Sequence, residues 1–256
     1  MAKLSWGSAT HAGQIRPQNE VNLLAVDGIY VVADGMGGHE AGEVASQIAV
    51  DRVQADLDME ELPGASTVVN SISNANGDIF RAAIANPGQA GMGTTLTAIA
   101  VIGDRLAGRG APNLDVNDDP GEVTPVVPAE PIEAFVLANV GDSRTYLLRH
   151  DRLRRVTVDH SYVQELVSTG HISEDEARTH PRRNIITRAL GIEPEVKVDW
   201  WTLPLIRGDR FLLCSDGLVD EVDDDVIKDT LTTISDPQKA SDRLVDQANE
   251  AGGRDN

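Results

Sequence analysis

Cysteine is almost missing from this sequence: Cys214 is the only one in 256 residues, so no disulfide can form within the chain. A chain without disulfides fits the reducing cytosol, and we predict a cytoplasmic location. Cys214 ends the apolar run 211–214 and is therefore predicted to be a small core residue rather than a nucleophile.

Long apolar runs and basic residues are also scarce. No stretch approaches the roughly 20 apolar residues that cross a bilayer, so no membrane segment is predicted here, although a longer parent chain could carry a tether. The 41 acidic residues outnumber the 22 Lys and Arg and give a formal net charge of −19. Such a surface repels nucleic acid and anionic lipid, which excludes both as partners.

Aromatic residues make up only 4% of the chain, whereas hydrophobic residues make up 41%. Valine, isoleucine, leucine and alanine must therefore fill most of the core. The length suits one large domain with two layers of sheet, or two small domains.

The most informative stretch that is present is 29–39. Residues 29–33 are typical of a buried strand, because β-branched and aromatic side chains occupy both faces. Asp34 is predicted to end this strand, and the glycine-rich turn after it lets the backbone approach a ligand closely. A carboxylate on a strand tip can hold a hard cation there, although an ordinary strand–turn–helix joint has the same pattern.

The dipeptide Asp27-Gly28 predicts a tight turn between two antiparallel strands, at 22–26 and 29–33. This pairing would place Arg16 and Glu20 near the end of the second strand. The hairpin therefore predicts a cluster of charged side chains at one edge of the sheet.

Strands and helices are predicted to follow one another in blocks. Hydrophobic spacing predicts two helices after the hairpin and two at the end of the chain. The helices are expected at 41–57, 66–85, 223–231 and 237–248, and the remaining strands at 4–11, 94–102, 134–140, 145–149, 153–158, 196–203 and 209–214.

Helix pairs that flank blocks of strands indicate segregated layers rather than alternating βαβ units. We therefore predict an α+β fold with a single domain over residues 1–256. The stretch 109–131, rich in proline, aspartate and glycine, is predicted to be a flexible insertion between paired strands. The polar stretch 159–191 has the composition of a lid, and Ser173 with Glu176 forms a capping-box pattern within it.

Four carboxylates stand beside glycine at or near the ends of apolar segments: Asp34, Asp142, Asp216 and Asp255. Carboxylates that are driven together repel and raise one another's pKa values unless cations share them. No cluster of histidine and cysteine accompanies them, which argues against zinc, whereas oxygen ligands favour Mg²⁺ or Mn²⁺. A pair of such ions can polarise a phosphoryl oxygen and supply a hydroxide for in-line attack.

Seven short motifs follow one another along nearly the whole chain, each weak alone and specific together. They are Arg16-x-x-x-Glu20, Val32-Ala-Asp-Gly-Met-Gly-Gly-His39, Gly42-Glu-Val-Ala-Ser46, Gly91-Met-Gly-Thr-Thr95, Gly141-Asp-Ser-Arg144, Leu213-Cys-Ser-Asp-Gly217 and Gly252-Gly-x-Asp-Asn256. In this order they resemble the metal-dependent protein phosphatases of the PPM (type 2C) family in its bacterial form. The resemblance implies a four-layer α-β-β-α fold, with a central antiparallel β-sandwich flanked by helix pairs.

The resemblance also implies an activity: hydrolysis of phosphoserine and phosphothreonine in proteins through a metal-bridging hydroxide. The cofactors would be two Mn²⁺ or Mg²⁺ ions, with a weaker third. Asp34 would bridge two ions and the Gly35 carbonyl would bind one of them. Asp216 and Asp255 would complete the first ion's ligands, and Asp142 would help to hold the third.

Four further residues receive roles from the same resemblance. Arg16 would bind the substrate phosphate as a bidentate donor, and Glu20 would hold a metal-bound water. His39 is a candidate general acid for the leaving alkoxide, the alternative being a structural histidine after the glycine-rich turn. His160 lies in the stretch that resembles the family's mobile flap, and a solvated loop residue is the favoured interpretation over a catalytic one.

The sequence departs from the family pattern at two places. Val21 stands where the family usually has an aspartate, which should weaken the ordering of water at the second metal. The family's final core strand is absent after residue 256, which would leave neighbouring strand edges unpaired and Asp255 on a frayed end.

The expected partners are phosphorylated proteins and the pathway of a cognate Ser/Thr kinase, which the enzyme would oppose as a monomer. The alternative function is a catalytically weakened module that binds phosphoproteins or regulates them, and Val21 and the end of the chain motivate it. A simple Ca²⁺-binding protein is a weaker alternative, because no Asp-rich loop follows the EF-hand spacing.

Overall fold

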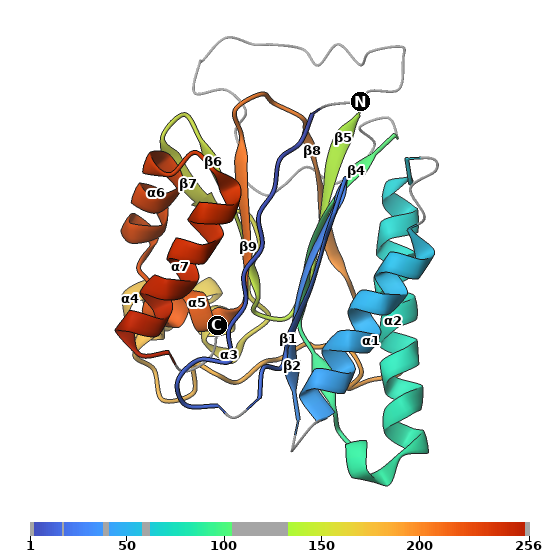
Figure 1. The fold of residues 1–256 in the computed structure, drawn as a ribbon. Helices are drawn as coiled ribbons and strands as arrows, with labels where there is room; N and C mark the ends of the chain where they lie inside the picture. Colours follow the sequence, from blue (N-terminus) through green and yellow to red (C-terminus); the bar gives the residue numbers. More distant parts are fainter. Residues whose placement is uncertain (1–2, 17, 38–40, 58–61, 104–132, 254–256) are drawn as a thin grey trace.

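The computed structural model describes residues 3–16, 18–37, 41–57, 62–103 and 133–253. These residues form two facing antiparallel sheets, with helices α1 and α2 outside one sheet and α6 and α7 outside the other (Figure 1). The predicted α+β class and its four-layer arrangement are therefore confirmed. The predicted insertion at 109–131 lies outside the described residues.

The larger sheet has the order β1-β2-β4-β5-β8, and the short strand β3 pairs with β2; the smaller sheet has the order β7-β6-β9. The strands are β1 (Val21–Val26), β2 (Ile29–Met36), β3 (Gly93–Thr94), β4 (Leu96–Ile102), β5 (Ala134–Val140), β6 (Arg144–Arg149), β7 (Arg152–Arg155), β8 (Asp199–Pro204) and β9 (Arg210–Cys214). The helices are α1 (Ala41–Asp56), α2 (Ala65–Ala85), the 3-10 turn η1 (Pro87–Gln89), α3 (Tyr162–Ser168), α4 (Glu174–Arg178), α5 (Asp216–Glu221), α6 (Asp224–Thr233) and α7 (Pro237–Ala251). No described helix has the length and apolar character that crossing a membrane requires.

The core consists of three clusters that match the three gaps between the layers. Strand β5, which is apolar except for Asn139, has both of its faces in these clusters. Ala138 belongs to the cluster under α1 and α2, whereas Leu137 belongs to the cluster between the sheets. Both faces of such a strand are buried, so apolar residues need not alternate with polar ones.

Hydroxyl pairs also cross the gap between the sheets. Thr97 on β4 lies 2.8 Å from Thr145 on β6, oxygen to oxygen, and neither side chain is exposed. A hydrogen bond between two buried hydroxyls satisfies both and fixes their relative position. These pairs therefore hold the sheets in register near the end where the acidic residues gather.

The predicted hairpin is confirmed, because Val26 pairs with Ile29 across the turn and Gly28 has a φ of 88°. Strand β2 is longer than predicted: it continues through Asp34 to Met36. Gly35 and Met36 pair with β3, a contact that no local sequence pattern predicts.

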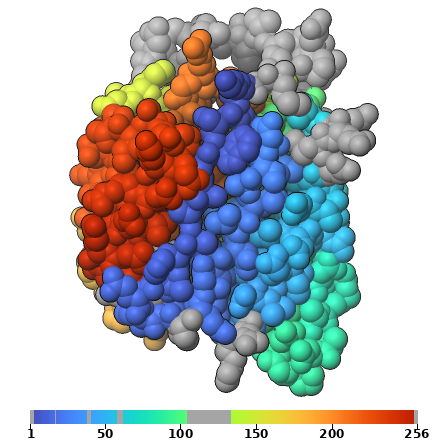
Figure 2. All heavy atoms as spheres, viewed as in Figure 1, coloured from blue at the N-terminus to red at the C-terminus, as the bar shows by residue number. Residues whose placement is uncertain are grey.

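The strand predicted at 4–11 is wrong, since the described residues there form no strand. The Ser8 backbone bonds instead to a side chain: its N–H donates to Gln238 Oε1 (3.2 Å) and its carbonyl accepts from Gln238 Nε2 (2.8 Å). Gly7 packs so closely against α7 that a Cβ on it would lie 2.3 Å from the Gln238 backbone. In Figure 2 this dark-blue segment lies on the surface beside the red C-terminal helices.

Cys214 is buried at the end of β9, as predicted, and burial raises the pKa of its thiol to about 12. The thiol therefore stays protonated at neutral pH and cannot serve as a nucleophile.

The ion pair between Arg149 and Asp209 joins β6 to the turn before β9, with two contacts of 2.6 and 2.8 Å. Only 3% of the Asp209 side chain is exposed. We predict that Asp209→Ala lowers the free energy of unfolding by about 2–3 kcal/mol, because it leaves a largely buried guanidinium unpaired. Urea denaturation measures this loss. As a control, Glu250→Ala removes an exposed ion pair with Arg243 and should cost less than about 1 kcal/mol; equal losses would contradict the prediction.

Candidate functional site

Asp34 is held by its backbone at the point where β2 passes from β4 to β3. Its carbonyl accepts hydrogen bonds from Thr95 N (2.8 Å) and Thr94 Oγ1 (2.8 Å), and its N–H donates to Thr95 Oγ1 (3.2 Å). Ala33 faces the core under α1 and α2, so alternation directs the Asp34 side chain toward the smaller sheet. Val21 is directly opposite on β1 and shares that face.

Thr95 also links Asp34 to the turn that carries the next acidic residue, Asp142. Thr95 Oγ1 lies 2.7 Å from Ser143 Oγ, beside Asp142 in the turn between β5 and β6. Gly141 in this turn has a φ of 104°, and a Cβ on it would lie 2.6 Å from Thr95 Cβ. Only glycine fits such a conformation and such a close approach.

Asp142 and Asp216 meet because of the pairing of β6 with β9. Arg144 pairs with Cys214 in this antiparallel ladder, so the two aspartates lie beyond the same end of it. Asp142 is 7% exposed, and burial raises the pKa of its carboxyl to about 8, with the Asp216 and then the Asp159 charge adding to the effect. Two carboxylates so placed need a cation to be ionised together.

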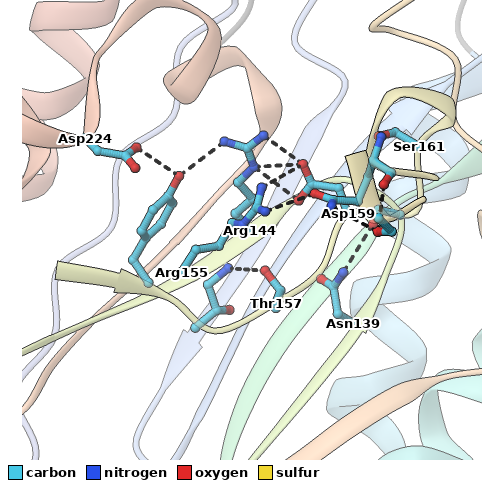
Figure 3. Close-up of polar contacts among 12 residues, drawn as sticks. Asn139, Arg144, Arg155, Thr157, Asp159, Ser161 and Asp224 are labelled. Atoms are coloured by element: carbon cyan, nitrogen blue, oxygen red, sulfur yellow. Dashed lines mark hydrogen bonds and ion pairs between the residues drawn. The ribbon is translucent and has the colours of Figure 1, made fainter. Parts of the chain in front are cut away.

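The nearest arginine is already engaged elsewhere (Figure 3). Arg144 donates to both oxygens of Asp159, at 2.7–3.1 Å, and to the Tyr146 hydroxyl at 3.2 Å. Tyr146 in turn donates to Asp224 (3.2 Å), while Arg155 also contacts Asp159 (3.4 Å). This network fixes the start of β6 and leaves the charge of Asp142 only weakly compensated.

Arg16 and Glu20 lie beside the glycine that follows Asp34, as the hairpin predicted. Gly35 N–H donates to the Glu20 carbonyl (3.1 Å), and Arg16 Nη1 donates to Glu20 Oε2 (2.8 Å). Gly42 at the start of α1 is so close that a Cβ on it would lie 2.4 Å from Glu20 Oε1. A Cβ on Gly35 would lie 2.0 Å from the Gly42 carbonyl, so this corner requires two glycines.

His160 is not the solvated loop residue that the sequence favoured, because it is only 7% exposed. The His160 side chain accepts a hydrogen bond at Nδ1 from the Gly141 N–H (3.0 Å), and the His160 backbone N–H donates to the Gly141 carbonyl (2.9 Å). Nε2 lies 3.2 Å from Asp199 Oδ2, and this bond is the main cause of a lowered pKa at Asp199. His160 therefore positions the turn that carries Asp142.

Hydrogen bonds at one end of the sandwich thus connect the segments that carry Arg16, Glu20, Asp34, Gly35 and Asp142, and the pairing of β6 with β9 brings Asp216 to the same end. His39 and Asp255 lie outside the described residues. Within the described part of the chain, no three His, Cys, Asp or Glu side chains form a group that could hold a metal ion. The described donors are all oxygen atoms, most of them from carboxylates, which fits a hard divalent cation at an acidic site that they do not complete.

Sequence reasoning missed the residues that support the aspartates. Thr95, Ser143 and Asp199 received no role, although the first two stand in motifs that were recognised. The signal available in the sequence was a hydroxyl residue next to an apolar run, and both hydroxyl residues are buried in the structure. Its partner could not be named, because the two hydroxyls come from different sheets.

We predict that Asp142→Asn stabilises the chelator-treated protein at alkaline pH. An aspartate whose pKa is raised in the folded state costs nothing near pH 4, and its cost grows until pH exceeds the folded pKa, here about 8. The gain in melting temperature should therefore be larger at pH 8.5 than at pH 5. With Mn²⁺ added, the parent protein should gain more stability than the variant. A gain independent of pH would contradict the predicted burial of charge.

Comparison with known proteins places this geometry in a family. The family model described as "Protein phosphatase 2C" matches residues 21–248. The serine/threonine phosphatase Stp of Listeria innocua is 36% identical over 260 residues, covering 96% of this chain and 90% of that protein. The serine/threonine protein phosphatase PstP of Mycobacterium tuberculosis is 37% identical, covering 99% of this chain but only 43% of PstP.

Solved structures agree with the sequence relatives. The crystal structure of the M. tuberculosis phosphatase PstP superposes with a TM-score of 0.80 at 36% identity, covering 96% of this chain and 92% of that one. A second structure, the PstP catalytic domain in complex with two manganese ions, gives 0.75 at 35% identity, with the same coverage. Both the fold and the order of motifs therefore lead to one conclusion: this chain belongs to the protein phosphatase 2C family of metal-dependent phosphatases.

Proposed function

We propose that the protein hydrolyses phosphoserine and phosphothreonine in other proteins, using bound Mn²⁺ or Mg²⁺. The observation that supports the proposal is that Asp142 and Asp216 lie beyond the same end of the β6–β9 ladder, while Thr95 links the Asp34 backbone to Ser143 next to Asp142. Family membership makes phosphate ester hydrolysis the chemistry that such an acidic site supports. The relatives Stp and PstP are named as serine/threonine phosphatases, which supports the substrate class.

The proposed ligands are oxygen atoms from distant parts of the chain. Asp34 and the Gly35 carbonyl would hold two ions together with Asp216 and Asp255, and Asp142 would contribute to a third. When bound, the ions would neutralise these carboxylates and the phosphate and supply an activated water. The chain's own part is to keep the ligands fixed, and the hydrogen bonds at Thr95 and Ser143 support that role.

Arg16 is the proposed phosphate-binding residue. Its side chain is 44% exposed. Glu20, four residues later in the sequence, orients it through a contact of 2.8 Å between Arg16 Nη1 and Glu20 Oε2. A guanidinium has a planar fork of donors that matches the oxygens of a phosphate. Glu20 would thus serve the site twice, by holding Arg16 and by binding water at the metal ions, and His39 remains the proposed general acid.

Phosphorylated proteins are the proposed partners, and the enzyme would oppose a Ser/Thr kinase in a bacterial cell. A cytoplasmic location is proposed for this domain, with a tether in a longer parent chain as an open alternative. PstP, of which this chain covers 43%, shows that relatives of the domain occur within longer proteins. The monomeric state stays a prediction.

The function is tested by phosphate release from a phosphothreonine peptide and from p-nitrophenyl phosphate with millimolar Mn²⁺. We predict that excess chelator abolishes release and that Asp216→Asn lowers it at least roughly a hundredfold, because the variant removes a ligand charge. Asp229→Asn, an exposed aspartate on α6, is the matched control and should keep the parental rate. Release that survives the chelator would contradict the proposed chemistry.

Val21 offers a test of the alternative, a weakened phosphoprotein-binding module. Val21 is 7% exposed and lies directly opposite Asp34 on the same face of the sheet. We predict that Val21→Asp lowers the Mn²⁺ concentration for half-maximal activity by about tenfold, because it adds a carboxylate next to the metal ligands. The neutral Val21→Asn separates charge from size. If only Val21→Asp releases phosphate, the alternative describes the natural chain.

A further inference from the structure

One stretch of this acidic protein is strongly basic. Residues 177–192, here called the basic segment, contain four arginines and one histidine but no aspartate or glutamate. Formal net charge over the whole chain is −19, so the basic segment is a local exception. The basic segment can contact a bound substrate only if it lies close to the acidic site.

The first part of the basic segment is anchored to the helix that begins with Asp216. Arg183 Nη2 lies 3.2 Å from Asp220 Oδ2, and Asp220 is four residues after Asp216 on α5. Four residues are about one turn of a helix, so both aspartates lie on the same side of α5. Arg183 therefore fixes the basic segment beside one acidic residue of the site.

The later part of the basic segment is anchored to the other two aspartates. Thr187 N–H donates to the His160 carbonyl (2.8 Å), and His160 pairs with Gly141, which precedes Asp142. Leu190 exchanges two backbone hydrogen bonds with Thr94 (2.9 and 3.1 Å), whose hydroxyl donates to the Asp34 carbonyl. The basic segment thus passes the supports of all three described aspartates, and it is mostly exposed in its first part, which carries Arg182, and buried at Ala189 and Leu190.

Arg182 differs from the other arginines of this segment. The others are paired with carboxylates: Arg178 with Asp223 (2.8 Å), Arg183 with Asp220 (3.2 Å) and Arg188 with Asp199 (3.1 Å). Arg182 is exposed, and its guanidinium carbon lies 5.7 Å from the ring centroid of Tyr162. Within the described part of the chain, no carboxylate lies in ion-pair contact with it. A guanidinium stacked on an aromatic ring keeps its edge donors directed outward, where they can meet a planar acid.

We infer that Arg182 binds a carboxylate side chain that flanks the phosphorylated residue of a protein substrate. The inference rests on the proposed function and names a substrate class for it: phosphoproteins with aspartate or glutamate near the phosphorylation site. Such substrates would otherwise be disfavoured by a protein with so much negative charge. Arg182 supplies local attraction at the rim while Arg16 takes the phosphate.

The experiment compares phosphothreonine peptides that carry glutamates or glutamines on both sides of the phosphorylated residue. For each protein, kcat/KM for the two peptides is divided by its own value for p-nitrophenyl phosphate. The parent should prefer the acidic peptide, and Arg182→Ala should lower that preference roughly two- to fivefold, the range for an exposed ion pair. Arg182→Lys should retain only part of it, because lysine keeps the charge but not the planar fork of donors, and Arg182→Glu should reverse it. The preference should also shrink as NaCl rises from about 0.05 to 0.5 M.

Arg207→Ala is the matched control, because Arg207 is an exposed arginine in the turn between β8 and β9, away from the basic segment. It should leave the preference unchanged. A parent that hydrolyses both peptides equally, or an Arg182→Ala loss that is the same for both, overturns the inference while leaving the phosphatase assignment intact. If no phosphate is released from any substrate, fluorescence anisotropy with thiophosphorylated versions of the two peptides still decides it: equal affinities overturn the inference, and an acidic preference lost in Arg182→Ala supports it.

Discussion

A buried carboxylate, Asp142, held close to a second one, Asp216, is the constraint around which this structure is arranged. Burial and the charge of Asp216 both oppose ionisation of Asp142, and the charge of Arg144 offsets them only in part. Arg144 is committed to Asp159 and Tyr146 through its hydrogen bonds. A structural ion pair would have been completed within the chain, whereas a pair of repelling acids is typical of a site completed by something that binds.

That repulsion can be sustained only because the backbone around it is held from several directions. The hydroxyl pairs Thr95–Ser143 and Thr97–Thr145 cross from one sheet to the other. His160 holds Gly141 through two hydrogen bonds, so the turn cannot swing the Asp142 side chain out into water. The cost of the acidic cluster is thus offset by many ordinary hydrogen bonds and by core packing in the three gaps between layers.

Local chemistry made part of this structure predictable. Asp27-Gly28 specifies a turn by itself, and the capping box of Ser173 and Glu176 is satisfied within four residues, so both were found in the sequence and are confirmed. The features that could not be predicted depend on residues far apart in the chain. The extension of β2 needs β3, the burial of His160 needs Gly141 and Asp199, and in the segment 4–11 the Ser8 backbone bonds to Gln238 instead of to a strand. The motifs located the acids, but the hydroxyls that support them were visible only after folding.

The sign of the overall charge poses a problem for an enzyme of this family, because both protein and substrate are anionic. Salt limits the reach of a surface charge to about 8 Å at physiological ionic strength, so the net charge governs approach only weakly and the nearest groups govern contact. Because Arg144 is paired with Asp159, the exposed cations beside the site are Arg16, oriented by Glu20, and arginines of the basic segment. An acidic molecule can therefore bind anionic phosphoproteins if a few exposed arginines border the site, which is the part proposed for Arg16 and Arg182.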